Sequence, residues 1–217
     1  MNYLLFVSFS FSILIAAVIG LVNFKKIDTA FHPFIYCIWL ASVNEIVSFQ
    51  LTKQHINTAP GNNIYVLAEA LLIGWQFKKW KMMSFYKHAF QIYVAFMMIV
   101  WLAENLPLSE LNKIKVGFRI TSSAIIVLMS MNLISKVIFE SGRSLVLNAK
   151  FIFGTAFIIY FLYRIFIESF LYFGFKIDAD LYSDIFIILS VINLLCNLLY
   201  ACALLCTPRK IYFIEPY

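Results

Sequence analysis

Seven apolar stretches, each about the length that a helix needs to cross a lipid bilayer, dominate this sequence. They fall at roughly residues 3 to 24, 33 to 52, 63 to 80, 86 to 105, 117 to 139, 149 to 175 and 182 to 207. A spanning α-helix needs about 20 apolar residues, and in lipid every backbone polar group must be hydrogen-bonded inside the protein. Because the connections are short, the sequence predicts an all-α polytopic membrane protein, with residues 1 to 217 forming a single seven-transmembrane-helix bundle.

Composition supports the membrane assignment. Hydrophobic residues make up 63% of the chain and charged residues only 13%, whereas soluble domains are about half apolar and a quarter charged. No loop is long enough for a soluble catalytic or DNA-binding module, so any function must reside in the bundle. The net charge of +6 is explained by cytoplasmic loops that face anionic headgroups. The lipid bilayer is therefore an expected partner and nucleic acid is not.

The distribution of lysine and arginine predicts the orientation. The third stretch is the weakest, because its uninterrupted apolar run extends only from Ile64 to Phe77, a length also typical of re-entrant segments. If all seven stretches cross with the N-terminus outside, eleven of these cations are cytoplasmic and five external, but the counts become six and ten if the third does not cross. Cytoplasmic loops carry an excess of Lys and Arg, so we expect seven spans and a cytoplasmic C-terminus. The eleven are Lys25, Lys26, Lys78, Lys79, Lys81, Lys87, Lys136, Arg143, Lys150, Arg209 and Lys210.

Arg164 lies close to the middle of the sixth stretch. A charged side chain there costs about 2.5–3.5 kcal/mol on insertion scales, so it should turn inward to a partner. Glu168 follows four residues later, on the same helical face, and we expect the two to pair within their own helix. Tyr160 and Tyr172 extend this face.

Polar residues recur at helical spacing on three further stretches. They are Asn44 and Glu45 on the second; Asn62, Tyr65, Glu69 and Gln76 on the third; and Ser190, Asn193, Asn197 and Tyr200 on the seventh. Spacings of three, four and seven place side chains on one helical face, so these faces should converge on a polar cavity open toward the outer side. Glu104 and Arg119 are expected to form a further ion pair between the fourth and fifth stretches.

The candidate ligand-binding residues combine acidic, basic and amide side chains. They are Glu45, Glu69, Arg164, Glu168, Asn193, Asn197, Asn44 and Tyr65. Because carboxylates outnumber the arginine, either some glutamates are protonated or a positive group joins them. Ionisable groups inside a membrane are functional by default, whereas the asparagines also fit hydrogen bonds that only hold neighbouring helices together. Both interpretations remain open at this stage.

Metal, retinal and nucleophilic chemistry are not expected. The cysteines lack metal-ligand spacing, and His32 and His88 are predicted at the end opposite to His55, so the histidines cannot share a metal. There is no G-x-S-x-G motif and no lysine in the last stretch for a retinal Schiff base. The sequence thus predicts no catalytic residue, no metal and no cofactor.

Three segments carry a resemblance to a known family. NNIYVLAEALLIGWQF at 62–77, LNAKFIFGTAFIIYFL at 147–162 and DIFIILSVINLLCNLLYACALL at 184–205 resemble a family of small bacterial seven-helix membrane proteins without an established activity. The positions that match are Asn63, Tyr65, Glu69, Asn148 and Asn193, whereas Arg164 and Glu168 have no counterpart. The resemblance implies a seven-helix bundle in the bacterial cytoplasmic (inner) membrane.

The polar residues favour a receptor-like or sensory protein that binds a small cationic or zwitterionic molecule or a lipid headgroup. Because the chain has no output domain, its signal would pass through helix shifts to a cytoplasmic or membrane signalling partner. A proton-coupled small-solute transporter, with one glutamate carrying the proton, is the first alternative. A membrane-embedded lipid-modifying enzyme that uses carboxylates as acid and base is the second, so enzymatic activity is the less expected outcome.

Overall fold

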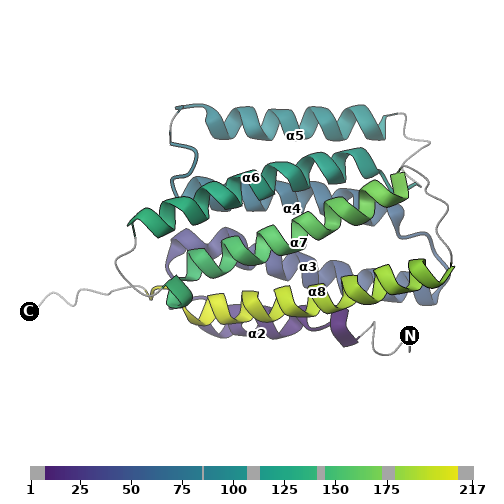
Figure 1. Ribbon diagram of the computed structural model, residues 1–217, viewed down its shortest axis with the longest axis horizontal. Helices are drawn as coiled ribbons and strands as arrows, with labels where there is room; N and C mark the ends of the chain where they lie inside the picture. Colours follow the sequence, from purple (N-terminus) through teal and green to yellow (C-terminus); the bar gives the residue numbers. More distant parts are fainter. Residues whose placement is uncertain (1–7, 85, 107–112, 141–144, 173–178, 210–217) are drawn as a thin grey trace, which may run out of the picture.

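The computed structural model describes residues 8–84, 86–106, 113–140, 145–172 and 179–209, and these ranges contain seven α-helices and no β-strand (Figure 1). The α-helices are α2 (Ile13–Asn23), α3 (His32–Lys53), α4 (Ala59–Lys79), α5 (Ala89–Asn105), α6 (Val116–Glu140), α7 (Ala149–Tyr172) and α8 (Ala179–Leu205). Two short 3-10 helices, η1 (Thr29–Phe31) and η3 (Leu145–Leu147), precede α3 and α7. Each predicted apolar stretch thus overlaps with one of these α-helices.

Several helices are long and apolar enough to cross a membrane. Four meet both criteria, namely Thr29–Lys53, Val116–Glu140, Ala149–Phe170 and Ile187–Leu205. Ser8–Asn23 and Ala89–Asn105 are apolar but shorter. The chain is therefore a helical membrane protein. Residues 3–7 and 173–175 of the predicted stretches, with Arg143 and Lys210, lie outside the described residues.

Helix α4 begins earlier than its apolar run predicts. It starts at Ala59 instead of residue 63, with Pro60 in its first turn. Proline suits this position because its fixed φ is helical and its missing N–H is not needed there. The Asn57 side chain also accepts a hydrogen bond from the Ala59 N–H at 2.9 Å, which satisfies one of the free donors at the start of the helix.

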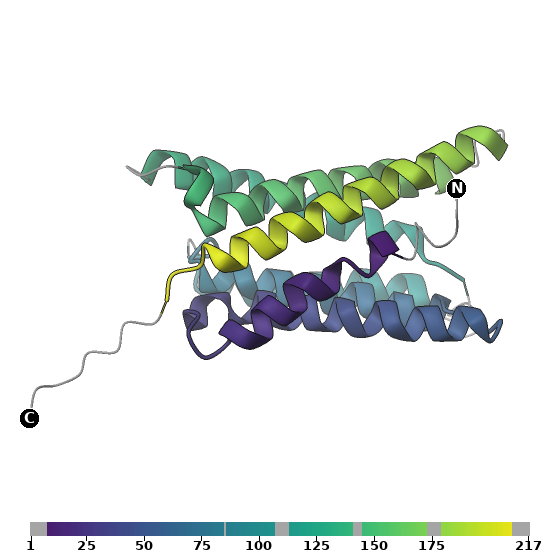
Figure 2. The same ribbon diagram turned by 90° about the horizontal axis from the view of Figure 1, so that it is seen from below.

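The helices lie side by side along one long axis, with α5 at one edge and α2 at the other (Figure 1). Figure 2 shows α7 and α8 on one side of the molecule and α2 and α3 on the other. The Gln76 side chain holds the end of α4 against the start of α3. It donates to the Ala30 carbonyl of η1 at 2.5 Å and accepts from the Phe34 N–H at 2.9 Å. The end of α8 reaches the same place, where the Asp28 N–H donates to the Pro208 carbonyl at 3.1 Å.

An aromatic cluster fills the core near this end of the bundle. Phe34 packs on Phe153 with ring centroids 4.1 Å apart, and Phe157 and Tyr200 lie against both. Phe34, Phe153 and Phe157 are at most 2% exposed. Gln76 is also fully buried here and serves the start of α3, so it does not join the polar site with Glu69 as its helical spacing predicts.

Candidate functional site

Arg164 and Glu69 form the central ion pair of the bundle. The Arg164 Nη1 of α7 donates to the Glu69 Oε2 of α4 at 2.6 Å, and the two residues are only 8% and 6% exposed. The predicted pair between Arg164 and Glu168 is therefore wrong. Both glutamates lie on faces that an arginine on α7 can reach, and the long guanidinium side chain crosses the helix interface instead of turning along its own helix. The pair thus joins α4 to α7.

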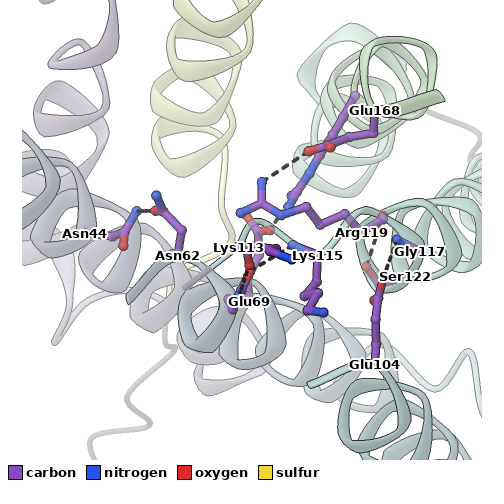
Figure 3. A network of polar contacts seen from close by, with 12 residues as sticks. Asn44, Asn62, Glu69, Glu104, Lys113, Lys115, Gly117, Arg119, Ser122 and Glu168 are labelled. Carbon is purple, nitrogen blue, oxygen red and sulfur yellow. Dashed lines mark hydrogen bonds and ion pairs between the residues drawn. The ribbon is translucent and has the colours of Figure 1, made fainter. Parts of the chain in front are cut away.

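Glu168 pairs instead with Arg119 of α6. The Arg119 Nη1 lies 3.1 Å from the Glu168 Oε1, and both side chains are largely buried (Figure 3). The predicted pair between Arg119 and Glu104 is therefore also wrong. Glu104 accepts hydrogen bonds from the Gly117 and Phe118 N–H groups at 2.8 and 2.6 Å, so a carboxylate at the end of α5 caps the start of α6, where free N–H groups and the helix dipole favour negative charge.

The remaining hydrogen-bonding capacity at these pairs is uneven. Both oxygens of Glu69 have a partner, since its Oε1 accepts from the Tyr65 hydroxyl at 2.7 Å while its Oε2 accepts from Arg164. By contrast, the Glu168 Oε2 and the Arg119 Nε are buried without a hydrogen-bond partner among the described residues. Buried polar atoms are nearly always hydrogen-bonded, so an unpaired acceptor and an unpaired donor on one ion pair mark a place where a ligand or water fits.

A cavity of about 230 Å³ lies beside these atoms. Its polar lining comes from four helices, α3, α4, α6 and α7, and is made up of Asn44, Glu45, Asn62, Tyr65, Arg119, Tyr160, Arg164 and Glu168. The volume is below the range of about 300–1,000 Å³ typical of pockets for drug-sized ligands. The cavity therefore suits a small solute or part of a headgroup.

Glu45 is the carboxylate in this lining that has no protein partner. It is half-buried on α3 and forms no ion pair or hydrogen bond within the described part of the chain. With Glu69 and Glu168, three carboxylates face two guanidiniums, so the group carries one formal negative charge when all are ionised. A positive ligand or a proton would neutralise this excess.

A second, smaller cavity of about 60 Å³ adjoins the first. The two share Glu45, Tyr65 and Tyr160. On each of α3, α4, α7 and α8 the residues of the smaller cavity extend about one to three turns further toward the aromatic cluster, for example Asn193 and Asn197 of α8 beyond Leu189. The two cavities therefore follow one another along the bundle, and the Arg164–Glu69 pair lies where they meet.

The eight predicted ligand-binding residues all line one or both cavities. Glu45 and Tyr65 belong to both, Asn44, Arg164 and Glu168 to the larger, and Glu69, Asn193 and Asn197 to the smaller. Two of the amides also bond to other elements of the chain. The Asn44 Nδ2 donates to the Asn62 Oδ1 at 3.2 Å, and the Asn197 Nδ2 to the Ser12 Oγ at 2.8 Å. The part of these eight residues in binding a ligand stays a prediction.

Arg119, Tyr160 and Asn62 also line the larger cavity but were not among the predicted ligand-binding residues. Tyr160 and Asn62 stand on the predicted polar faces of α7 and α4, four residues before Arg164 and three before Tyr65, so the spacing was a usable signal. Arg119 had no such signal. It lies in the first turn of α6, among residues that read as a loop boundary, and only the packing of α6 against α7 brings it to Glu168.

Two of the asparagines on which the resemblance in the sequence rests, Asn63 and Asn148, have structural partners. The Asn63 side chain donates to the Lys113 carbonyl at 2.9 Å and accepts from the Lys115 N–H at 3.3 Å, which ties α4 to the segment before α6. The Asn148 Oδ1 accepts from the Lys150 N–H at 3.0 Å and caps the start of α7. Asn is favoured before the first turn of a helix because its side-chain oxygen accepts a hydrogen bond from a free backbone N–H of that turn.

The described residues contain no group of His, Cys, Asp and Glu side chains that could hold a metal ion. The four cysteines are free thiols. No family model, curated protein sequence or solved structure matches the chain. The chemistry of the two cavities is therefore the basis for proposing a function.

Proposed function

We propose that this protein is a receptor or sensor whose larger cavity binds a small cationic or zwitterionic solute, or a lipid headgroup of that charge. The observation that carries the proposal is the set of unused groups around one space, namely the unpaired Glu45 carboxylate, the Glu168 Oε2 and the Arg119 Nε. An ammonium group would be held by the two carboxylates. The anionic part of a zwitterion would accept from Arg119.

The proposal places the site in a seven-span bundle of a bacterial cytoplasmic membrane, with all 217 residues in one domain, the N-terminus outside and the C-terminus in the cytoplasm. Two observations support this topology. The described residues contain seven α-helices, and helices that follow one another in the sequence pack against each other. Helix α4 has the weakest apolar character because it carries Asn63, Glu69 and Gln76. All three are buried inside the protein, so α4 presents little of this polarity to lipid.

A signal would leave the cavity through the two ion pairs. Arg164 connects α7 to α4, and Glu168 connects α7 to α6. A ligand that takes hydrogen bonds from one member of a pair changes the relative stability of the helix positions that the pair holds. Small shifts and rotations of packed helices are a common switching movement, and they would be passed to a cytoplasmic or membrane signalling partner.

The test is a binding measurement on the protein in lipid nanodiscs, by calorimetry or tryptophan fluorescence. Choline and glycine betaine serve as probes, and the uncharged tert-butyl analogue of choline is the matched control ligand. We expect saturable binding of at least one charged probe and none of the neutral analogue. Glu45→Gln should weaken it at least tenfold, because opposite charges about 4 Å apart attract each other by about 4 kcal/mol at an effective dielectric constant of about 20, and the neutral amide loses this attraction. Glu140→Gln, an exposed carboxylate at the far end of α6, should leave it unchanged.

If every probe fails to bind, or if Glu45→Gln and Glu168→Gln bind as the native chain does, the carboxylates only hold helices together and the proposal is wrong. Glu45 has no protein partner to lose, so its replacement is not expected to unfold the bundle. The stability of each variant without ligand provides that control.

The second cavity favours a proton-coupled transporter as the other candidate. Two cavities in series, with the Arg164–Glu69 pair where they meet, are what a carrier with a central gate requires. In proteoliposomes, uptake of a bound probe that follows a pH gradient and is lost in Glu69→Gln would support transport. Binding without uptake would support the receptor, and turnover of a lipid pool would support an enzyme that uses these carboxylates as acid and base.

A further inference from the structure

A third cavity, of about 300 Å³, lies at the opposite end of the bundle from the Glu168–Arg119 pair. It is formed where α4 and α6 end and α7 begins. Four lysines from three parts of the chain line it, namely Lys79, Lys81, Lys136 and Lys150. It shares no lining residue with the two cavities described above, so it is a separate candidate site.

Positive charge around this cavity is largely uncompensated. Glu140 is its one acidic lining residue, and it lies 3.8 Å from Lys136. Lys79, Lys81 and Lys150 form no ion pair within the described residues. Four ammonium groups that repel one another around one space, against one carboxylate, favour an anion between them.

The lining of the cavity includes a residue with an unused hydrogen-bond donor. Trp80 lines the cavity and is 4% exposed, and its Nε1 is buried without an acceptor among the described residues. Leu133 and Val137 also line the cavity and are buried. A buried indole N–H normally has a partner, so this Nε1 is a donor that an oxygen atom of a ligand would satisfy.

Lys81 has a backbone conformation that usually requires glycine. Its φ is 58°, in the left-handed region that costs a side-chain-bearing residue about 1–2 kcal/mol. The Met82 N–H donates to the Phe77 carbonyl and the Lys81 N–H to the Lys78 carbonyl, both at 3.0 Å, which is the Schellman arrangement that ends a helix and favours glycine at this position. Lys81 occupies this position despite that preference, and it lines the cavity.

We propose that this cavity binds the phosphate group of an anionic ligand, with the lysines around the phosphate and the Trp80 N–H donating to one of its oxygens. The phosphate belongs either to an anionic phospholipid headgroup or to a soluble phosphate compound, since both present the same chemistry. The excess of lysine on cytoplasmic loops accounts for the side of the membrane on which these residues lie. This excess does not account for the convergence of four lysines on one cavity whose lining includes Trp80, with its buried and unpaired N–H.

The test uses the full chain in a neutral detergent and measures the midpoint of thermal unfolding. One arm adds phosphatidylglycerol in mixed micelles, with phosphatidylcholine of the same acyl chains as control. The other adds inorganic phosphate or pyrophosphate, with chloride at equal ionic strength as control. We expect one arm to stabilise the native chain in a saturable way, since a ligand that binds only the folded state raises its stability by mass action.

Three variants locate the effect. Lys150→Gln and Lys81→Gly should each weaken binding about fivefold, from the loss of one cation near the surface. His55→Gly is the matched control for the backbone change. His55 has a φ of 56° in the same Schellman arrangement, which follows the last residue of α3 and lies away from this cavity. The variant should bind as the native chain does. Trp80→Phe keeps every charge and should weaken binding about tenfold through the lost hydrogen bond.

Trp80→Phe also separates this site from general attraction to anionic surfaces, which it would not change. The proposal is overturned if neither arm exceeds its control, or if Lys81→Gly, Lys150→Gln and Trp80→Phe all respond as the native chain does. The unfolding midpoint without ligand shows whether a variant has lost packing instead of binding.

Discussion

Glu69 and Arg164, ninety-five positions apart in the sequence, meet at 2.6 Å in the middle of the bundle. Their contact fixes α4 against α7 at the point where the two polar cavities adjoin. It also holds α4, the least apolar of the helices, against the rest of the protein. Within the described residues, neither Arg164 nor Glu69 has another partner of opposite charge at hydrogen-bonding distance.

Breaking this pair should destabilise the bundle strongly. Arg164→Ala leaves the Glu69 carboxylate buried with only the Tyr65 hydroxyl, and removing one member of a buried pair costs about 3–5 kcal/mol. The double variant Arg164→Met with Glu69→Gln should regain most of that loss, because it removes both charges and keeps the volume. Denaturant unfolding in detergent of Arg164→Met, Glu69→Gln and their double variant, arranged as a double-mutant cycle, measures the coupling. A double variant as unstable as Arg164→Ala alone would contradict the expectation.

The Glu104 carboxylate should contribute to stability through the start of α6. Glu104→Ala removes the acceptor for the Gly117 and Phe118 N–H groups, and loss of a helix cap costs about 0.5–2 kcal/mol. Thermal unfolding reports the change. Glu140→Ala, at the exposed end of the same helix, is the control and should change stability by no more than a few tenths of a kcal/mol. Equal effects of the two substitutions would refute the capping role.

Helix α4 offers two glycines with opposite expected responses to alanine. A Cβ at Gly74 would overlap the Tyr93 ring, whereas one at Gly61 would meet nothing within 4 Å. Gly74→Ala should therefore cost about 1–3 kcal/mol through overpacking, while Gly61→Ala should stabilise by about 0.5–1 kcal/mol. Unfolding midpoints of both variants decide the matter, and a neutral Gly74→Ala would show that α4 and α5 can separate without cost.

Gln76 should be less tolerant of an apolar replacement than its membrane setting suggests. Gln76→Leu keeps the size but leaves the Phe34 N–H and the Ala30 carbonyl without their buried partner, at about 1–3 kcal/mol for each unsatisfied group. Gln76→Glu keeps an acceptor for the Phe34 N–H. Its ionised form loses the donor to Ala30 and adds the cost of a buried charge, whereas its protonated form keeps one O–H donor. Hydrogen exchange of the first turn of α3 would show which bond is lost.

The helices could be predicted closely because each depends on its own composition. Apolar runs bounded by charged or turn-forming residues place α3, α5, α6 and α7 within three residues of the expected starts. Where the boundary moved further, as at α4, the cause was a local signal, Pro60 and Asn57, that an apolar count does not include.

The partners of the charged side chains could not be predicted in the same way. Spacing alone puts Glu168 on the face of Arg164, but it holds no information about which neighbouring helix brings a competing carboxylate closer. Arg119 shows the same limit, since Glu104 and Glu168 are both plausible partners until the packing of α6 is known. The polar faces were therefore predictable, whereas the pairing within them depends on tertiary structure.

The aromatic cluster beneath the smaller cavity determines which kind of protein the polar residues can serve. Phe34, Phe153 and Phe157 pack against one another, and a solute at Glu69 would have to displace these rings to move further toward that end of the bundle. A carrier would have to part these rings in every cycle, while a sensor gains from their rigidity. Transport would thus require movement of these three phenylalanine rings in addition to opening of the Arg164–Glu69 pair.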